Sequence, residues 1–180
     1  TMLSQIHTEF WGSPDKRPLW GWKDPRNSFT LPIWQMIYPD MKVIHVVRNG
    51  IDVSSSLQSR EQSRGGKFTN HVFSCRSLSL EGGFDVWAEY VSQSRKVLET
   101  VPDDNKLEIV YEELLTDTSE QFLKLENFLR VPMEKIREVI VALTRSIIPS
   151  NAYKFKLNER LFDFYLTRQH HPLMGVYGYS

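Results

Sequence analysis

The segment KVIHVVRNGIDVSSSLQSRE, residues 42–61, constrains the fold most, because it combines a strand, a turn and a helix without a break. Residues 42–47 are β-branched and almost continuously apolar, which is typical of a strand buried in a parallel sheet. Asn49 and Gly50 form the turn, and a helix is predicted over residues 51–64 with Val53 and Leu57 on its core face. Such a unit indicates an α/β fold, in which ligands bind at the carboxyl ends of the strands.

The rest of the chain continues the alternation of strands and helices. A second strand is predicted at residues 106–111 and a short one at 19–23, while residues 1–18 read as irregular and 65–83 as a long loop. Helices are predicted at 29–38, 84–101, 118–129, 133–144 and near 158–167. This order predicts three layers, a parallel sheet flanked by helices. Since no segment has linker composition, residues 1–180 are expected to form a single domain.

Charge and cysteine content exclude several classes of protein. The 22 basic residues balance 22 acidic ones, so a partner held by a broad positive field, such as nucleic acid, is not expected. One cysteine excludes an internal disulfide and every multi-cysteine metal site. No apolar run reaches the roughly 20 residues that span a bilayer. Without a signal-peptide pattern at its start, the chain is expected to be cytoplasmic.

The residues after the first long strand are suited to binding an anion. Arg48 offers a planar pair of donors for phosphate or sulfate oxygens, and the following helix offers free backbone N–H groups. Gly50 leaves room for a ligand near the backbone, while Ser56 and Arg60 share one helix ridge with Asp52. The alternative is that Arg48 caps a helix or pairs with Asp52, and that the serines are solvated surface. The residues alone leave both interpretations open.

Four elements of the sequence resemble the sulfotransferases that use 3′-phosphoadenosine 5′-phosphosulfate (PAPS). The Arg48 segment, with a Ser eight positions later, resembles their 3′-phosphate-binding motif. WGWKDPR, residues 20–26, resembles a Lys-Asp-Pro element of bacterial and tyrosylprotein sulfotransferases. The stretch IVYEELLTDTSEQFLKLENFLRVP, residues 109–132, resembles a later strand and helix of the family, and LMGVYGYS, residues 173–180, resembles the Gly-Tyr ending of bacterial members.

The resemblance implies a P-loop NTPase-like sulfotransferase fold and specific roles for five residues. Arg48 and Ser56 would bind the 3′-phosphate, Arg60 matches a basic residue of the tyrosylprotein branch, and Tyr111 would contact the donor nucleotide. Lys23 would be catalytic, because a cation near the bridging oxygen stabilises the charge on the leaving phosphate. The implied co-substrate is PAPS, the product is 3′,5′-adenosine bisphosphate, and no metal is needed. The acceptor would be a hydroxyl or amine of a small molecule, glycan or peptide.

Two family features are not found in the sequence. No Gly- and Ser/Thr-rich phosphosulfate loop precedes Trp20, and His7 and Glu9 are too close to Lys23 to match the family's general base. The chain is therefore expected to be incomplete at its N-terminus. One alternative is a non-catalytic module that has the same fold and binds an adenosine 3′-phosphate or a protein partner. A P-loop kinase-like enzyme is another, although the pattern G-x-x-x-x-G-K-[ST] is missing.

Overall fold

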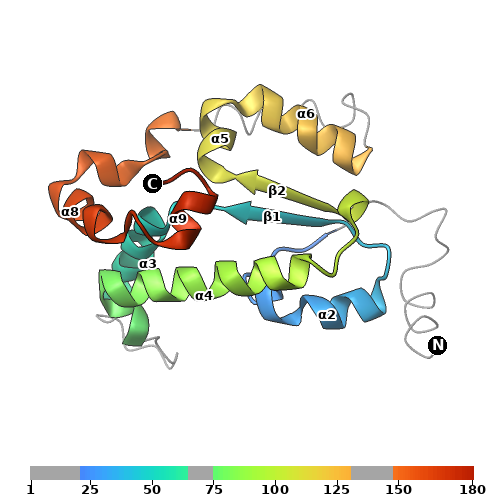
Figure 1. Ribbon diagram of the computed structural model, residues 1–180, viewed down its shortest axis with the longest axis horizontal. Helices are drawn as coiled ribbons and strands as arrows, with labels where there is room; N and C mark the ends of the chain where they lie inside the picture. Colours follow the sequence, from blue (N-terminus) through green and yellow to red (C-terminus); the bar gives the residue numbers. More distant parts are fainter. Residues whose placement is uncertain (1–20, 65–74, 131–147) are drawn as a thin grey trace.

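The computed structural model describes residues 21–64, 75–130 and 148–180 (Figure 1). The regular elements follow in chain order: α2 (Asn27–Ile37), β1 (Val43–Val47), α3 (Gly50–Arg64), α4 (Leu80–Leu98), β2 (Lys106–Val110), α5 (Tyr111–Thr116), α6 (Thr118–Leu129), α8 (Glu159–Arg168) and α9 (Pro172–Val176). Short 3₁₀ helices lie at Cys75–Leu78, Asp103–Asn105, Pro149–Asn151 and Lys154–Leu157. Within these ranges, no helix has the length and apolar character needed to cross a membrane.

Strands β1 and β2 form a parallel pair in which Val43 lies opposite Lys106 and Val47 opposite Val110. Parallel strands need a long crossover, and here α3 and α4 lie between them in the chain. Figure 1 shows the pair between α2 and α4 on one side and α5 and α6 on the other. The predicted α/β fold, with a parallel sheet between helices, is confirmed.

Helix α4 supplies the apolar stripe that joins the two hydrophobic clusters of the described residues. It contributes Phe84, Trp87 and Val91 to a cluster that also contains Val47, Ile51, Phe155, Phe164, Met174 and Tyr179. Its last turn packs Val97 against Leu31 of α2. Burying an apolar side chain of this size contributes about 1.5–3 kcal/mol. The larger cluster therefore holds the start of α3 and the C-terminal segment against the same helix.

The first strand is less buried than the sequence suggests. Only Val47 is fully buried, whereas Ile44 and Val46 are 40% and 54% exposed. Side chains alternate between the two faces of a strand, and α2 and α4 cover only the face that carries Val43 and Val47. An apolar run therefore predicted the strand correctly and its burial on both faces incorrectly.

Several boundaries also differ from the predictions. Residues 21–23 have no regular structure. The prediction of a short strand at 19–23 is therefore wrong for the residues that the structure describes. Helix α4 begins at Leu80 rather than at residue 84, because the Ser79 side chain accepts a hydrogen bond from the N–H of Gly82 and caps the helix. Tyr111 begins α5 instead of ending the strand. The predictions for 1–18 and 133–144 lie outside the described residues.

Candidate functional site

The carboxyl ends of both strands collect residues from three separate parts of the chain. Strand β1 ends at Val47, and α3 begins two residues after Arg48. Strand β2 runs directly into α5 at Tyr111. Figure 1 shows the C-terminus beside the two arrowheads. This is the position at which open α/β sheets bind their ligands.

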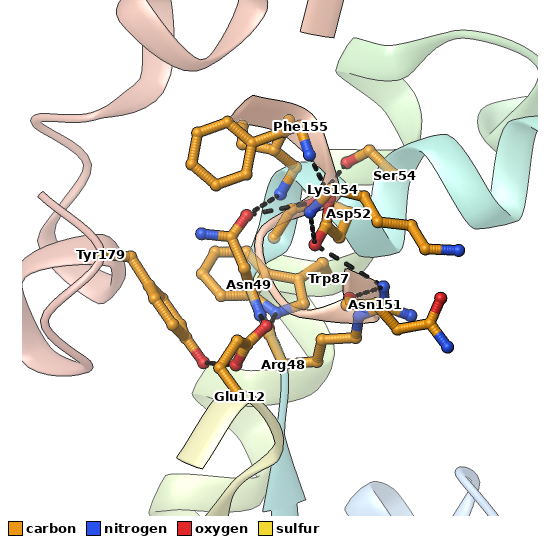
Figure 2. Close-up of polar contacts among 12 residues, drawn as sticks. Arg48, Asn49, Asp52, Ser54, Trp87, Glu112, Asn151, Lys154, Phe155 and Tyr179 are labelled. Carbon is orange, nitrogen blue, oxygen red and sulfur yellow. Dashed lines mark hydrogen bonds and ion pairs between the residues drawn. The ribbon is translucent and has the colours of Figure 1, made fainter. Parts of the chain in front are cut away.

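Arg48 lies against the Tyr111 ring and has both partnered and unpartnered nitrogens. Figure 2 shows its contacts with Asp52 and Asn151. Its guanidinium carbon is 4.8 Å from the centroid of the Tyr111 ring. Nη2 is 3.5 Å from Oδ2 of Asp52 and donates to the Asn151 carbonyl at 3.3 Å. Nε is buried and has no hydrogen-bond partner in the described part of the chain. The pairing with Asp52 that the sequence left open is therefore present, and Nε is a donor without an acceptor among the described residues.

Asn49 fixes the first turn of α3. Its Oδ1 accepts hydrogen bonds from the N–H groups of Ile51 at 2.9 Å and Asp52 at 3.4 Å, which makes it the N-cap. Its Nδ2 is also buried without a partner among the described residues. The sequence indicated Asn49 only as a turn residue, although Asn is among the best N-cap residues.

Asp52 ties the C-terminal segment to α3. Its side chain is 1% exposed and accepts the backbone N–H groups of Lys154 at 3.1 Å and Phe155 at 2.9 Å. A buried carboxylate needs such donors, because an unpaired one would lose its hydration without compensation. Asp52 therefore connects Arg48 with a segment about a hundred positions later in the chain.

Glu112 is a second buried carboxylate at the strand ends, and the sequence analysis did not identify it. It is 1% exposed and accepts the N–H of Asn49 at 3.0 Å and the hydroxyl of Tyr179 at 2.7 Å. Burial, reinforced by the nearby Glu112, raises the pKa of Tyr179 well above its ordinary value. Tyr179 thus stays protonated and can donate. In the sequence, the only indication of this role was an acidic residue beside a predicted strand end.

Gly50 serves packing rather than ligand access. A Cβ atom at this position would lie 2.7 Å from the Trp87 ring and 2.9 Å from the Phe84 ring. The indole Nε1 of Trp87 also donates to the Arg48 carbonyl at 2.9 Å. The expectation that Gly50 makes room for a ligand is corrected, since aromatic side chains of α4 occupy that side.

The other predicted ligands of the 3′-phosphate continue along α3. Ser56 is exposed, one turn after Asp52 on the same helix ridge. Arg60 is half exposed and its Nη2 lies 3.3 Å from Oε1 of Glu61. The structure thus brings Arg48 and Tyr111 into contact and places Ser56 and Arg60 beyond them on one helix.

Lys23 is exposed, immediately before the turn that leads into α2. Its neighbour Asp24 pairs with Arg26, and this hydrogen bonding lowers the pKa of Asp24 to about 2. Among the described residues, no hydrogen bond or ion pair joins Lys23 to Arg48 or Tyr111. Arg26 is thus the hydrogen-bonded partner of Asp24, and Lys23 acts on Asp24 only through its nearby positive charge.

The match to known proteins comes from one family. The sequence model of the sulfotransferase family matches residues 1–135 of the 180. The chain belongs to the sulfotransferase family. No curated protein and no solved structure matches it. The matched part of this sulfotransferase contains all five predicted site residues, whereas Asn151 and Tyr179 lie beyond it.

The strand ends of this sulfotransferase fit an anionic group. The buried Nε of Arg48 has lost its hydrogen bonds to water and has no acceptor among the described residues. A buried donor without an acceptor costs free energy, and an acceptor atom of a ligand would remove this cost. A guanidinium presents its donors in a plane that matches phosphate oxygens. The ring of Tyr111 fixes that plane from one side.

Proposed function

We propose that this sulfotransferase uses PAPS as its sulfuryl donor and binds the donor's 3′-phosphate at Arg48. The observation that supports this most directly is the buried, unpartnered Nε of Arg48 beside the N-terminus of α3. Free N–H groups and the dipole of a helix N-terminus favour a negative group at this position. A phosphate oxygen would supply the acceptor that Arg48 lacks.

Three further residues are proposed to act with Arg48. Ser56 would donate its hydroxyl to the same phosphate, and Arg60 would add positive charge one turn later on α3. Tyr111, whose ring already contacts Arg48, would border the nucleotide. Because Asp52 holds only Nη2 of Arg48, the remaining donors of the guanidinium can bind the ligand while that contact persists.

The reaction is the transfer of a sulfuryl group to an acceptor oxygen or nitrogen. A bond forms between the acceptor atom and sulfur, the bond from sulfur to the bridging oxygen breaks, the acceptor's proton passes to solvent, and 3′,5′-adenosine bisphosphate leaves. Lys23 is proposed to stabilise the negative charge that develops on the leaving phosphate. The acceptor would be a hydroxyl or amine of a small molecule, a glycan or a peptide.

Isothermal titration calorimetry with 3′,5′-adenosine bisphosphate tests this proposal. Arg48→Ala should weaken binding roughly 10- to 100-fold, as expected when hydrogen bonds to a charged group are lost. Arg76→Ala is the matched control, since Arg76 is exposed and pairs with Glu89 at 2.8 Å. A wild-type protein that does not bind, or an Arg48→Ala variant that binds equally well, would show the donor assignment to be wrong.

A transfer assay with labelled PAPS separates the enzyme from the non-catalytic alternative. The enzyme should transfer the label to an acceptor from a panel of phenols, glycans and tyrosine peptides. If the protein binds the bisphosphate but transfers no label to any of these acceptors, the nucleotide-binding module is the better description.

A further inference from the structure

The peptide group between Arg48 and Asn49 is held at both of its polar atoms by buried side chains (Figure 2). Trp87 of α4 donates to its carbonyl at 2.9 Å, and Glu112 of α5 accepts its N–H at 3.0 Å. Trp87 and Glu112 are only 4% and 1% exposed. A peptide group is planar, so two contacts on opposite edges fix its orientation. They thereby fix the direction in which the Arg48 side chain leaves the backbone.

Glu112 is held in turn by Tyr179, near the C-terminal end of the chain. The Tyr179 hydroxyl donates to Oε2 at 2.7 Å, while Oε1 accepts from Asn49. Tyr179 is 4% exposed and belongs to the larger hydrophobic cluster. Each carboxylate oxygen of Glu112 thus has one donor. Without the Tyr179 hydroxyl, one buried oxygen would be unsatisfied, and the carboxylate would gain by turning away from Asn49.

We propose that Glu112 and Tyr179 are positioning residues for Arg48, and that they set the protein's preference for nucleotides with a 3′-phosphate. The inference rests on the proposed function. It gives the C-terminal end a role in donor recognition, although this end lies outside the residues that match the family.

A purely structural role for Tyr179 makes a different prediction. If Tyr179 only anchored the C-terminus, its substitution would change stability and affect all adenine nucleotides alike. A positioning role lowers affinity only for ligands that carry the 3′-phosphate. The ratio of affinities for 3′,5′-adenosine bisphosphate and adenosine 5′-monophosphate distinguishes the two roles.

Tyr177→Phe is the matched control for Tyr179→Phe. Tyr177 also donates its hydroxyl to a glutamate, Glu108 of β2, at 3.0 Å. That glutamate has no hydrogen bond to the peptide group after Arg48 among the described residues. We expect Tyr179→Phe to lower the affinity ratio roughly three- to ten-fold, the loss typical of one hydrogen bond. Tyr177→Phe should keep the ratio within about two-fold.

The outcomes of this titration are distinguishable. If the wild-type protein has no preference for the bisphosphate, the proposed donor is wrong. If the wild type has this preference and folded Tyr179→Phe keeps it, the positioning role is overturned. Circular dichroism at the titration temperature verifies that each variant is folded.

Two further measurements cover the case in which Tyr179→Phe does not fold. Glu112→Gln keeps an oxygen for the Asn49 N–H and should preserve the affinity ratio, whereas Glu112→Leu should lower it. Equal ratios in these two variants would overturn the inference. The amide ¹H–¹⁵N signal of Asn49 tests the contact without ligand, since it should shift in Glu112→Leu and not in Tyr177→Phe.

Discussion

Arg48 makes the contact with Asp52 that the structural interpretation of the sequence predicted, whereas its role toward an anion stays a prediction. Nη2 contacts Asp52 and the Asn151 carbonyl, which is the structural role, while the buried Nε has no partner among the described residues. The five donors of a guanidinium make both roles compatible. Asp52 is four residues away in the sequence and was foreseeable as a partner. The contact with Asn151, about a hundred residues later, was not.

The role of Lys23 is a prediction at the level of a single residue. Lys23→Ala should reduce the rate of sulfuryl transfer about 100-fold, because it removes charge stabilisation from the leaving phosphate. Affinity for 3′,5′-adenosine bisphosphate should change by less than about three-fold, since Arg48 is intact. Steady-state kinetics and calorimetry measure the two quantities. Lys124→Ala, on α6 and paired with Glu120 at 3.0 Å, is the control. Equal rates in both variants would contradict the assignment.

Gly50 gives a prediction on packing. Gly50→Ala places a Cβ atom 2.7 Å from Trp87, so either the α4 ring or the start of α3 has to move. We expect the free energy of unfolding to fall by about 1–3 kcal/mol, as in other overpacked cores. Urea denaturation measures it. At Gly175, the nearest atom to a new Cβ is 4.0 Å away, so Gly175→Ala should leave stability almost unchanged.

At the level of elements, three helices begin at a side-chain cap, and the sequence analysis misplaced the start of only one of them, α4. Ser79 caps α4, Asp117 caps α6 and Asn158 caps α8. The two glycines at 82 and 83 favoured a loop interpretation, which placed the start of α4 four residues too late. Gly83 lies close to α3, since a Cβ atom here would lie only 3.0 Å from the backbone of Ser54. Close packing of the two helices, rather than turn formation, explains this glycine.

Ser79→Ala is the corresponding test at the level of the helix. Loss of the hydrogen bond from Gly82 leaves an N–H at the start of α4 without its cap, which costs about 1 kcal/mol. Ser92→Ala, in the middle of the same helix, should change stability by less than about 0.5 kcal/mol. Thermal or urea unfolding compares the stability of the two variants with that of the wild type. Two variants of equal stability would show that Ser79 does not determine where the helix begins.

For the whole molecule, the C-terminal third does more than pack around the sheet. Asn151, Lys154 and Phe155 meet the Arg48 region, and Tyr179 reaches Glu112. A second link runs across the middle of the sheet. His45 of β1 lies 2.8 Å from Glu108 of β2, which also accepts the Tyr177 hydroxyl. His45 thus has a hydrogen-bonding partner on the neighbouring strand.

This second link predicts how the fold responds to acid. The hydrogen bond with His45 lowers the pKa of Glu108 below its ordinary value of 4.5. The ionised carboxylate is therefore favoured in the folded state, and its contribution is present above pH 4.5 and lost as the pH falls through the lowered pKa. Urea unfolding from pH 6 to pH 3 should show a smaller acid-induced loss of stability in Glu108→Gln than in the wild type. Identical pH dependence would contradict this link.

The sequence by itself determined the two strands β1 and β2, most of the described helices, the parallel pairing and the family. These properties depend on local periodicity and on residues that are close in the chain, such as the segment from Val43 to Ser56. It also predicted Lys23, Arg48, Ser56, Arg60 and Tyr111 as site residues, and those roles stay predictions. Only the tertiary structure decided which segments complete the strand ends. Contacts of Asp52 with Lys154 and of Glu112 with Tyr179 join residues 102 and 67 positions apart, and no local pattern encodes such a pair. The donors of a buried carboxylate are set only when the chain packs, because burial removes the water that would otherwise bind the carboxylate oxygens.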